Sequence, residues 1–289
     1  MTTQELVKTI AAAPANAGPR ILITRTREIL GVNVSVFTRQ GASEFVVESL
    51  SQRRKLCVAF ANHNLLLELT RHPHGSDLLK EFLVLNDGVG LNVASRLLYG
   101  TRFPENLNGS DFTPLLLRSM PVGTRVFLFG ARPHVAEAAA KVIERDHEVC
   151  VCGVADGYAS DHAAVASAVN RSQSDVVLVG LGNPKQEEWI AKFSSHVDAP
   201  LLVGVGAFLD FCAGAVRRAP KPVQKARLEW AFRLCLEPRR LGRRYTWDAV
   251  TFFVDVLQQK LRPSPPASSA VSPRHSKRRM AELRPRRSA

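Results

Sequence analysis

The sequence has few of the residues that would place the protein outside a reducing compartment or inside a membrane. Its five cysteines, an odd number in 289 residues, lack the spacing of a disulfide framework. No apolar segment follows the N-terminus as in a secretory signal peptide. The longest apolar stretch, residues 200–216, is interrupted by Asp210 and by glycines, and is shorter than the ~20 residues of a membrane-spanning helix. We therefore predict a cytoplasmic protein that meets a membrane from one side only.

Two of the cysteines, Cys150 and Cys152, alternate along a predicted strand, which would place both thiols on one face. Burial in the core is the simpler interpretation, and a metal or redox role is the alternative. No cluster of histidine, cysteine and acidic residues with the spacing of metal ligands is visible in the sequence.

Basic residues are concentrated at one end of the chain. There are 39 basic and 26 acidic residues, a formal net charge of +13. Residues 1–220 hold 22 basic and 21 acidic side chains, whereas residues 221–289 hold 17 and 5. We therefore expect the first three quarters of the chain to form an ordinary globular unit and the last quarter to bind polyanions.

Composition divides the chain into four predicted parts. These are a flexible leader (1–20), an α/β core (21–220), a basic helical appendage (221–262) and a disordered basic tail (263–289). In the appendage we expect a basic helix over residues 221–244 and a second helix over residues 245–261. The second helix carries an apolar stripe at helical spacing, made of Trp247, Val250, Val254, Leu257 and Leu261.

Short apolar runs alternate with helical segments through the core, and glycine stands at several strand-to-helix turns. The predicted strands are 55–61, 83–85, 125–129, 175–179 and 201–205, and the predicted helices 65–69, 78–82, 133–145 and 184–192. This alternation is typical of an α/β fold with a mostly parallel, Rossmann-like sheet flanked by helices. Ligands bind such sheets beyond the carboxyl ends of the strands, which is where Asp87, Gly130 and Gly182 fall.

Polar residues follow two of the predicted strands. Asp87 precedes Gly88 and is a candidate general base, able to take a proton from an attacking hydroxyl. The alternative is an N-cap of the next helix. Asn62 and Asn64 end the strand upstream and could orient a sugar hydroxyl, although asparagine is also a common turn residue. We expect His63, between them, to be structural.

Two glycine-containing turns are candidates for nucleotide binding. Gly130 ends an apolar strand before an alanine-rich helix, as in the first turn of a nucleotide-binding βαβ unit, but tight packing explains it equally well. The segment 180–187 is more specific, because its glycines free the backbone and its proline suits a helix start. Solvated side chains at a helix N-terminus are the alternative. The predicted nucleotide ligands are Gly130, Gly180, Gly182, Pro184, Lys185 and Glu187.

Several separated motifs, in order, resemble those of the TagA/WecG/CpsF glycosyltransferase family. They are Asn86-Asp87-Gly88-Val89-Gly90, Ala94-Ser95-Arg96, the segments 126–130 and 180–187, Arg218-Ala219-Pro220, Glu229-Trp230, Arg233 and Glu237-Pro238-Arg239-Arg240. The resemblance extends over roughly residues 29–245. Several blocks in the right order are more specific than any one of them.

The resemblance implies an inverting, metal-independent glycosyltransferase without a cofactor. Its donor would be a UDP-sugar and its acceptor an undecaprenyl-diphosphate-linked saccharide, used in bacterial cell-surface polysaccharide synthesis. It implies a general base at Asp87 and active-site roles for Asn62 and Gln186. We add Asn64 and Asp111 as substrate-binding candidates.

The resemblance also implies that the basic appendage seats the enzyme on the anionic inner face of the cell membrane and closes over the donor diphosphate. The basic residues predicted for this role are Arg218, Arg227, Arg233, Arg240 and Arg244. The resemblance does not specify the transferred sugar, the acceptor saccharide or the oligomeric state. A homo-oligomer is one of the alternatives.

Two positions depart from the family pattern. Phe60 stands where the family often has threonine, which removes a hydroxyl near the sugar. Asn106 stands where an arginine is common, which removes a cation near the leaving diphosphate. Arg102 or a tail arginine would have to replace that cation.

Two other classes of protein share some of these sequence features. The arginine-rich end suggests a nucleic-acid-binding protein, but residues 263–289 carry no aromatic side chains among the basic ones. A Rossmann-like oxidoreductase would need a complete glycine fingerprint and a ribose-binding acid, and neither is clear. We therefore expect no nucleic-acid partner.

Overall fold

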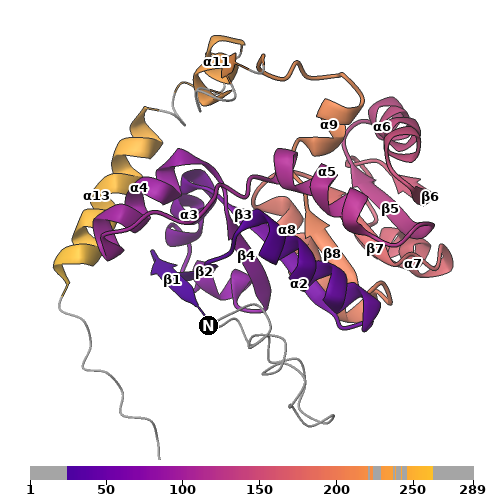
Figure 1. Cartoon of the computed structure of the whole chain (residues 1–289), viewed down its shortest axis with the longest axis horizontal. Coiled ribbons are helices and arrows are strands. Elements are labelled where there is room, and N and C mark those ends of the chain that lie inside the picture. The colour runs from indigo at the N-terminus through magenta and orange to yellow at the C-terminus, as the bar shows by residue number, and fades with distance from the viewer. Residues whose placement is uncertain are drawn as a thin grey trace, which may run out of the picture.

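The computed structural model describes residues 25–220, 222–223, 229–236, 238, 242 and 246–262. These residues form three layers, with helices on both faces of a six-stranded sheet and a two-stranded hairpin beside it (Figure 1). The predicted leader 1–20 and tail 263–289 lie outside the described residues, so the predicted division of the chain stays a prediction.

The central sheet is parallel throughout and has the order β4-β3-β8-β7-β5-β6. The predicted Rossmann-like α/β class is therefore confirmed. The hairpin pairs its two strands antiparallel. The strands are β1 (Thr26–Ile29), β2 (Val32–Ser35), β3 (Leu56–Ala61), β4 (Phe82–Asn86), β5 (Thr124–Gly130), β6 (Val149–Ala155), β7 (Val176–Gly180) and β8 (Leu201–Gly204).

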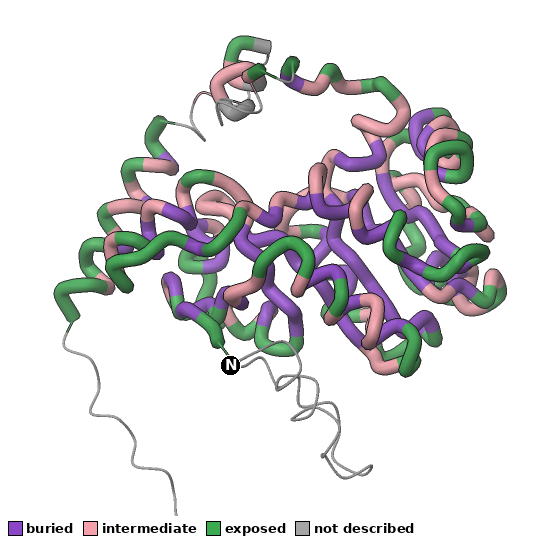
Figure 2. Tube along the Cα trace, viewed as in Figure 1, coloured by how far each residue is buried: buried purple, intermediate pink, exposed green. Residues whose placement is uncertain are grey.

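Two hydrophobic clusters fix which helices cover which face of the sheet. One cluster joins α3 (His63–Thr70), α4 (Gly88–Tyr99), η1 (Gly75–Leu79), α7 (His162–Arg171), α8 (Lys185–Phe193) and α13 (Trp247–Leu261) to the sheet. The other joins α2 (Arg39–Ser51), α5 (Gly109–Ser119), α6 (Pro133–Asp146) and α9 (Phe208–Cys212). The strands between them, apart from the edge strand β6, are buried along most of their length (Figure 2).

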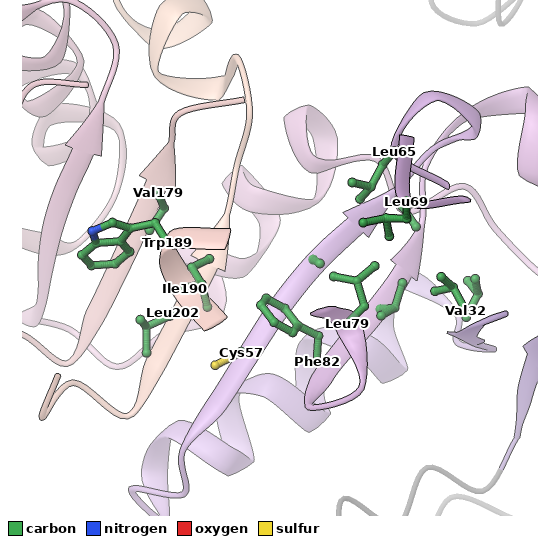
Figure 3. Packing of buried hydrophobic residues seen from close by; sticks show 14 of the residues in the cluster. Val32, Cys57, Leu65, Leu69, Leu79, Phe82, Val179, Trp189, Ile190 and Leu202 are labelled. Carbon is green, nitrogen blue, oxygen red and sulfur yellow. The ribbon is translucent and has the colours of Figure 1, made fainter. Parts of the chain in front are cut away.

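Helix α8 shows how the first cluster is built. Trp189 and Ile190 point from α8 onto Val179 of β7 and Leu202 of β8 (Figure 3). The ring of Trp189 also meets that of Phe129 edge-on, with 5.0 Å between centroids. This packing fixes the start of α8 against the ends of the central strands. A short 3-10 turn, η2 (Ser194–His196), follows the helix.

The helix predicted over residues 78–82 is wrong. A 3-10 turn, η1, covers Gly75–Leu79, and Phe82 already begins strand β4. All five residues of β4 are buried, and Phe82 pairs with Cys57 of β3. Pairing with a neighbouring strand therefore overrides the local pattern.

The predicted burial of both Cys150 and Cys152 on one face is also wrong, because Cys150 is exposed and Cys152 half-buried. Both lie on β6, the edge strand next to β5. The pairing with β5 shifts register from Val126↔Val151 to Phe127↔Gly153, which leaves Cys152 out of the ladder. Such a bulge breaks the simple alternation on which the prediction relied.

The C-terminal segment turns back over the first part of the chain. Helix α11 (Glu229–Leu236) lies between α9 and α13, and α13 packs on α3 and α4 (Figure 1). Gln259 of α13 accepts a hydrogen bond from the Leu30 amide of the hairpin, with 2.9 Å between the atoms. Only part of the predicted helix 221–244 is described. Among the described helices, none has both the length and the apolar character needed to cross a bilayer.

Candidate active site

Asn62 and Asp87 lie side by side at the carboxyl edge of the sheet. Ala61 pairs with Asn86 where β3 and β4 end, and the Asp87 amide donates to the Ala61 carbonyl at 2.7 Å. Asn62 and Asp87 therefore begin helices α3 and α4 on neighbouring strands. Both side chains are half-buried.

The capping alternative for Asp87 is not supported. Asp87 occupies the N-cap position of α4, but within this described helix its side chain makes no capping hydrogen bond. The first helical amide, that of Gly88, instead donates to Oδ1 of Asn106 at 2.7 Å. Asn106, where the family pattern favours arginine, therefore supports the loop that carries Asp87.

Asn62 does cap its helix. Its Oδ1 accepts hydrogen bonds from the amides of Asn64 and Leu65 at 3.1 and 3.0 Å. His63 lies between two other helices, since its ring meets Phe252 of α13 and a Cβ at Gly90 of α4 would approach its Cβ to 3.0 Å. This packing agrees with a structural role for His63, which stays a prediction.

Gly130 and Gly180 meet at a topological switch point of the sheet. From β5 the chain runs outward to β6 through α6, and from β7 it runs to β8 through α8 on the opposite face. Gly130 pairs with Gly180, and a Cβ at Gly130 would lie 2.4 Å from the Gly180 carbonyl oxygen. Packing alone therefore requires glycine at position 130. The same place is where α/β sheets of this kind bind ligands.

Gln186 lies over the end of β8, between the two regions just described. It is buried, and its Oε1 accepts from the Gly206 amide at 2.9 Å. A Cβ at Gly204 would come within 2.9 Å of its Nε2. The alternative of solvated side chains at this helix start is wrong for Gln186 and Glu187, while Lys185 is exposed.

Glu187 has no exposed surface. Its Oε1 accepts from Nδ2 of Asn183 at 2.7 Å and from Nε2 of Gln186 at 2.8 Å. Burial raises the pKa of this carboxyl group to about 8, although the two amide donors act in the opposite direction. A direct contact with a nucleotide, as predicted, is therefore not open to Glu187 in this conformation, and its carboxyl group instead holds two neighbouring side chains.

Asp111 and Arg218, predicted for different roles, contact each other. Their side chains form an ion pair, and Nδ2 of Asn108 donates to Oδ2 of Asp111 at 2.8 Å. The start of α5 lies beside the end of β3, since a Cβ at Gly109 would approach the Phe60 ring to 2.9 Å. The ion pair is therefore close to the same edge of the sheet, and Phe60 faces the core there.

The site is an extended edge and not one cluster. Asp87 follows β4 and the segment 180–187 follows β7, which are three strand spacings apart, roughly 14 Å. Asn64 lies next to Asn62 in the first turn of α3. Arg227, Arg240 and Arg244 lie outside the described residues, as does the side chain of Arg233.

Two residues at this edge escaped the sequence reasoning. Tyr158 follows β6 with 74% of its surface exposed, and the preceding Gly157 amide donates to the Ala131 carbonyl at 2.8 Å. Asp210 lies in α9 after β8, where burial raises its pKa and the charge of Arg132 opposes that shift. The only sequence signals were a glycine before the tyrosine and an acid interrupting an apolar stretch.

A parallel α/β sheet with polar side chains and glycines along its carboxyl edge defines a Rossmann-like protein, in which the switch point is the candidate ligand site. The model of the glycosyl transferase WecG/TagA/CpsF family matches residues 27–266, and the chain belongs to this family. It is therefore a glycosyltransferase, and the resemblance found in the sequence motifs is confirmed.

Two relatives show how close this likeness is. An N-acetylglucosaminyldiphosphoundecaprenol N-acetyl-beta-D-mannosaminyltransferase of Bacillus spizizenii is 32% identical over 197 residues, which cover 67% of this chain and 76% of the relative. A protein of the same name from Staphylococcus aureus is 28% identical over 221 residues, 75% of this chain and 87% of the relative. The nucleic-acid alternative gains no support from these matches.

Proposed function

We propose that the protein transfers a sugar from a UDP-sugar to a saccharide on undecaprenyl diphosphate, with inversion at the anomeric carbon and without a metal ion. The names of the relatives specify transfer of an N-acetylmannosaminyl group to N-acetylglucosaminyldiphosphoundecaprenol. That donor sugar and that acceptor are therefore the first pair to test, ahead of glucose and the uronic acid.

One observation carries this proposal: a carboxylate and an amide side chain stand on adjacent strand ends, with Asn62 beside Asp87. In the proposed reaction the acceptor hydroxyl oxygen attacks the anomeric carbon while its proton passes to the Asp87 carboxylate. The bond between the anomeric carbon and the diphosphate oxygen breaks, and its electron pair leaves on UDP. One displacement of this kind inverts the anomeric configuration.

The donor would lie along the carboxyl edge. Its nucleotide would lie beyond the switch point formed by the buried Gly130 and Gly180, next to Gly182, where a Cβ would meet nothing within 4 Å. The exposed ring of Tyr158 offers a stacking surface for the base. The sugar would then extend across the end of β8, over the buried Gln186, toward Asp87, which accounts for the three strand spacings between the two ends.

The leaving diphosphate needs positive charge or N–H donors. Asn106 cannot supply the charge of the arginine that the family pattern favours, and it is engaged by the Gly88 amide. Arg218 is a described cation near this edge, paired with Asp111. We assign the diphosphate to Arg218, with Arg227, Arg233, Arg240 and Arg244 as further predicted contacts.

Association with the inner face of the cell membrane is part of the same proposal. The apolar stripe of α13 does not dock on the core: Trp247 is 70% exposed, and Val250, Val254, Leu257 and Leu261 are exposed as well. Phe252 and Val256, on another side of the helix, face the core. An exposed apolar stripe close to a basic segment is typical of a helix that lies in a membrane interface.

Transfer can be measured directly with the purified full chain. UDP-N-acetylmannosamine and a synthetic polyprenyl-diphosphate N-acetylglucosamine are mixed with the enzyme, and both UDP and the extended lipid are quantified, with and without EDTA. We expect both products in equal amounts, unchanged by EDTA. Absence of the extended lipid with every UDP-sugar tried would overturn the proposal, and loss of activity in EDTA would overturn its metal-independent form. Among the described residues, no group of three metal-ligating side chains is gathered.

A further inference from the structure

A buried hydrogen-bond chain connects the start of α8 to the end of β8. It runs from Nδ2 of Asn183 to Oε1 of Glu187, which also accepts from Nε2 of Gln186. Oε1 of Gln186 then accepts from the Gly206 amide. Both hydrogen-bonding atoms of the Gln186 amide are thereby held, one by a side chain and one by the backbone.

We propose that Glu187 is a positioning residue for the transfer reaction, which holds the side-chain amide of Gln186 in one orientation across the middle of the active edge. Glu187 cannot contact the substrate directly in this conformation, because its side chain has no exposed surface. Its geometry therefore supports a positioning role. Glu187 acts through Gln186, whose amide lies where β8 separates the nucleotide region from Asp87.

Among the described residues, no basic side chain pairs with the buried carboxyl group of Glu187. Two amide donors converge on Oε1, whereas Oε2 is enclosed and has no hydrogen-bond partner among the described residues. The two groups that bind Glu187 are neutral amides. The raised pKa of this carboxyl group, about 8, agrees with a proton on it at neutral pH. A neutral acceptor orients Gln186 without placing a negative charge near the donor diphosphate.

The backbone around the chain is shaped to admit Gln186. A Cβ at Gly204 would lie 2.9 Å from Nε2 of Gln186, so a larger residue there would displace this side chain. At Gly180 a Cβ would approach the carbonyl oxygen of Gly206 to 3.1 Å. The ends of β7 and β8 thus approach closely, and the Glu187 chain fixes their spacing.

This inference rests on the proposed function, and two readouts separate the two. The first is turnover of Glu187→Ala, Glu187→Gln, Gln186→Ala and the Gln186→Ala/Glu187→Ala double variant, with Glu188→Ala as the matched control, because Glu188 is exposed on the same helix. We expect kcat of Glu187→Ala to fall on the order of 10²-fold, as for a misplaced active-site group. We expect Glu187→Gln to retain most of the turnover, because it keeps the acceptor oxygen. We expect the double variant to be hardly slower than Gln186→Ala.

The second readout needs no activity. Hydrogen–deuterium exchange of the Gly206 amide reports its bond to Gln186. We expect faster exchange in Glu187→Ala and Gln186→Ala, and wild-type exchange in Glu187→Gln and Glu188→Ala. If the wild-type chain shows no transfer, the proposed function is refuted, but the role of Glu187 in holding Gln186 is not. Unchanged Gly206 exchange in folded Glu187→Ala, additive effects on kcat, or a Glu187→Gln variant as slow as Glu187→Ala would each refute the role of Glu187.

Discussion

At the residue scale, Glu187 also makes the stability of the protein depend on pH. An ordinary glutamate has a pKa near 4.5, whereas burial raises that of Glu187 to about 8. Between these values the folded chain holds a proton that the unfolded chain has released. The free energy of unfolding should therefore fall as pH rises through this window, by about 1.4 kcal/mol per pH unit from this group.

The measurement compares melting temperatures of the wild type and Glu187→Gln from pH ~5 to ~10. Because the amide introduced by this substitution cannot titrate, the variant should gain stability relative to the wild type as pH rises, and the difference should level off above pH ~8. Glu188→Gln is the control, since its side chain is exposed. Parallel curves for the wild type and Glu187→Gln would contradict burial of a neutral acid.

The ion pair between Arg218 and Asp111 gives a second residue-scale prediction. The two side chains are 31% and 38% exposed, so their pairing contributes little to stability. Arg218→Ala should therefore melt near the wild-type temperature but raise the KM for the donor about tenfold or more, as expected for a lost bond to a charged group. Arg217→Ala, the exposed neighbour, is the control. Equal KM values for both variants would rule Arg218 out as a diphosphate contact.

At the scale of elements, the exposed apolar stripe of α13 predicts which face of this helix contacts a membrane. Leu257 lies on the stripe, and Gln258 is its exposed polar neighbour. Leu257→Asp and Gln258→Asp add the same charge, but only the first removes an apolar contact. We expect Leu257→Asp to bind anionic phosphatidylglycerol vesicles about tenfold more weakly than Gln258→Asp, since a buried leucine contributes ~1.5–3 kcal/mol. Equal flotation of the two variants would exclude the stripe from the membrane contact.

The same helix shows what could be predicted from the sequence and what could not. Periodicity identified the stripe from Trp247 to Leu261, and α13 does cover Trp247–Leu261. Its orientation could not be predicted, because the shorter row of Phe252 and Val256 faces the core instead. Strand β5 was predictable from its apolar run, whereas the segment 78–82 was too short for periodicity to distinguish a helix from the turn and strand that form there.

At the scale of the whole molecule, strand order decides the shape of the site. Motifs at strand ends predicted a shared edge, and the parallel sheet provides one. The insertion of β7 and β8 between β3 and β5 depends on contacts far apart in the sequence, which no local pattern encodes. It separates Asp87 from the turn at Gly130 and Gly180, and Gln186 lies over β8 between them. The buried chain of Asn183, Gln186 and Glu187 was equally invisible, because helical spacing does not reveal which polar side chains turn inward.

We propose that the carboxylate beside Asn62 removes the proton of the acceptor hydroxyl, and Asp87→Asn tests this role most directly. The variant keeps the size of the side chain, and the nucleotide region lies three strand spacings away. Asp198→Asn makes the same change at an exposed residue before β8, at the opposite edge of the sheet. We predict unchanged UDP affinity by calorimetry and a turnover lowered by about 10²–10⁴-fold for Asp87→Asn, with wild-type values for Asp198→Asn. Wild-type turnover of Asp87→Asn would contradict the account.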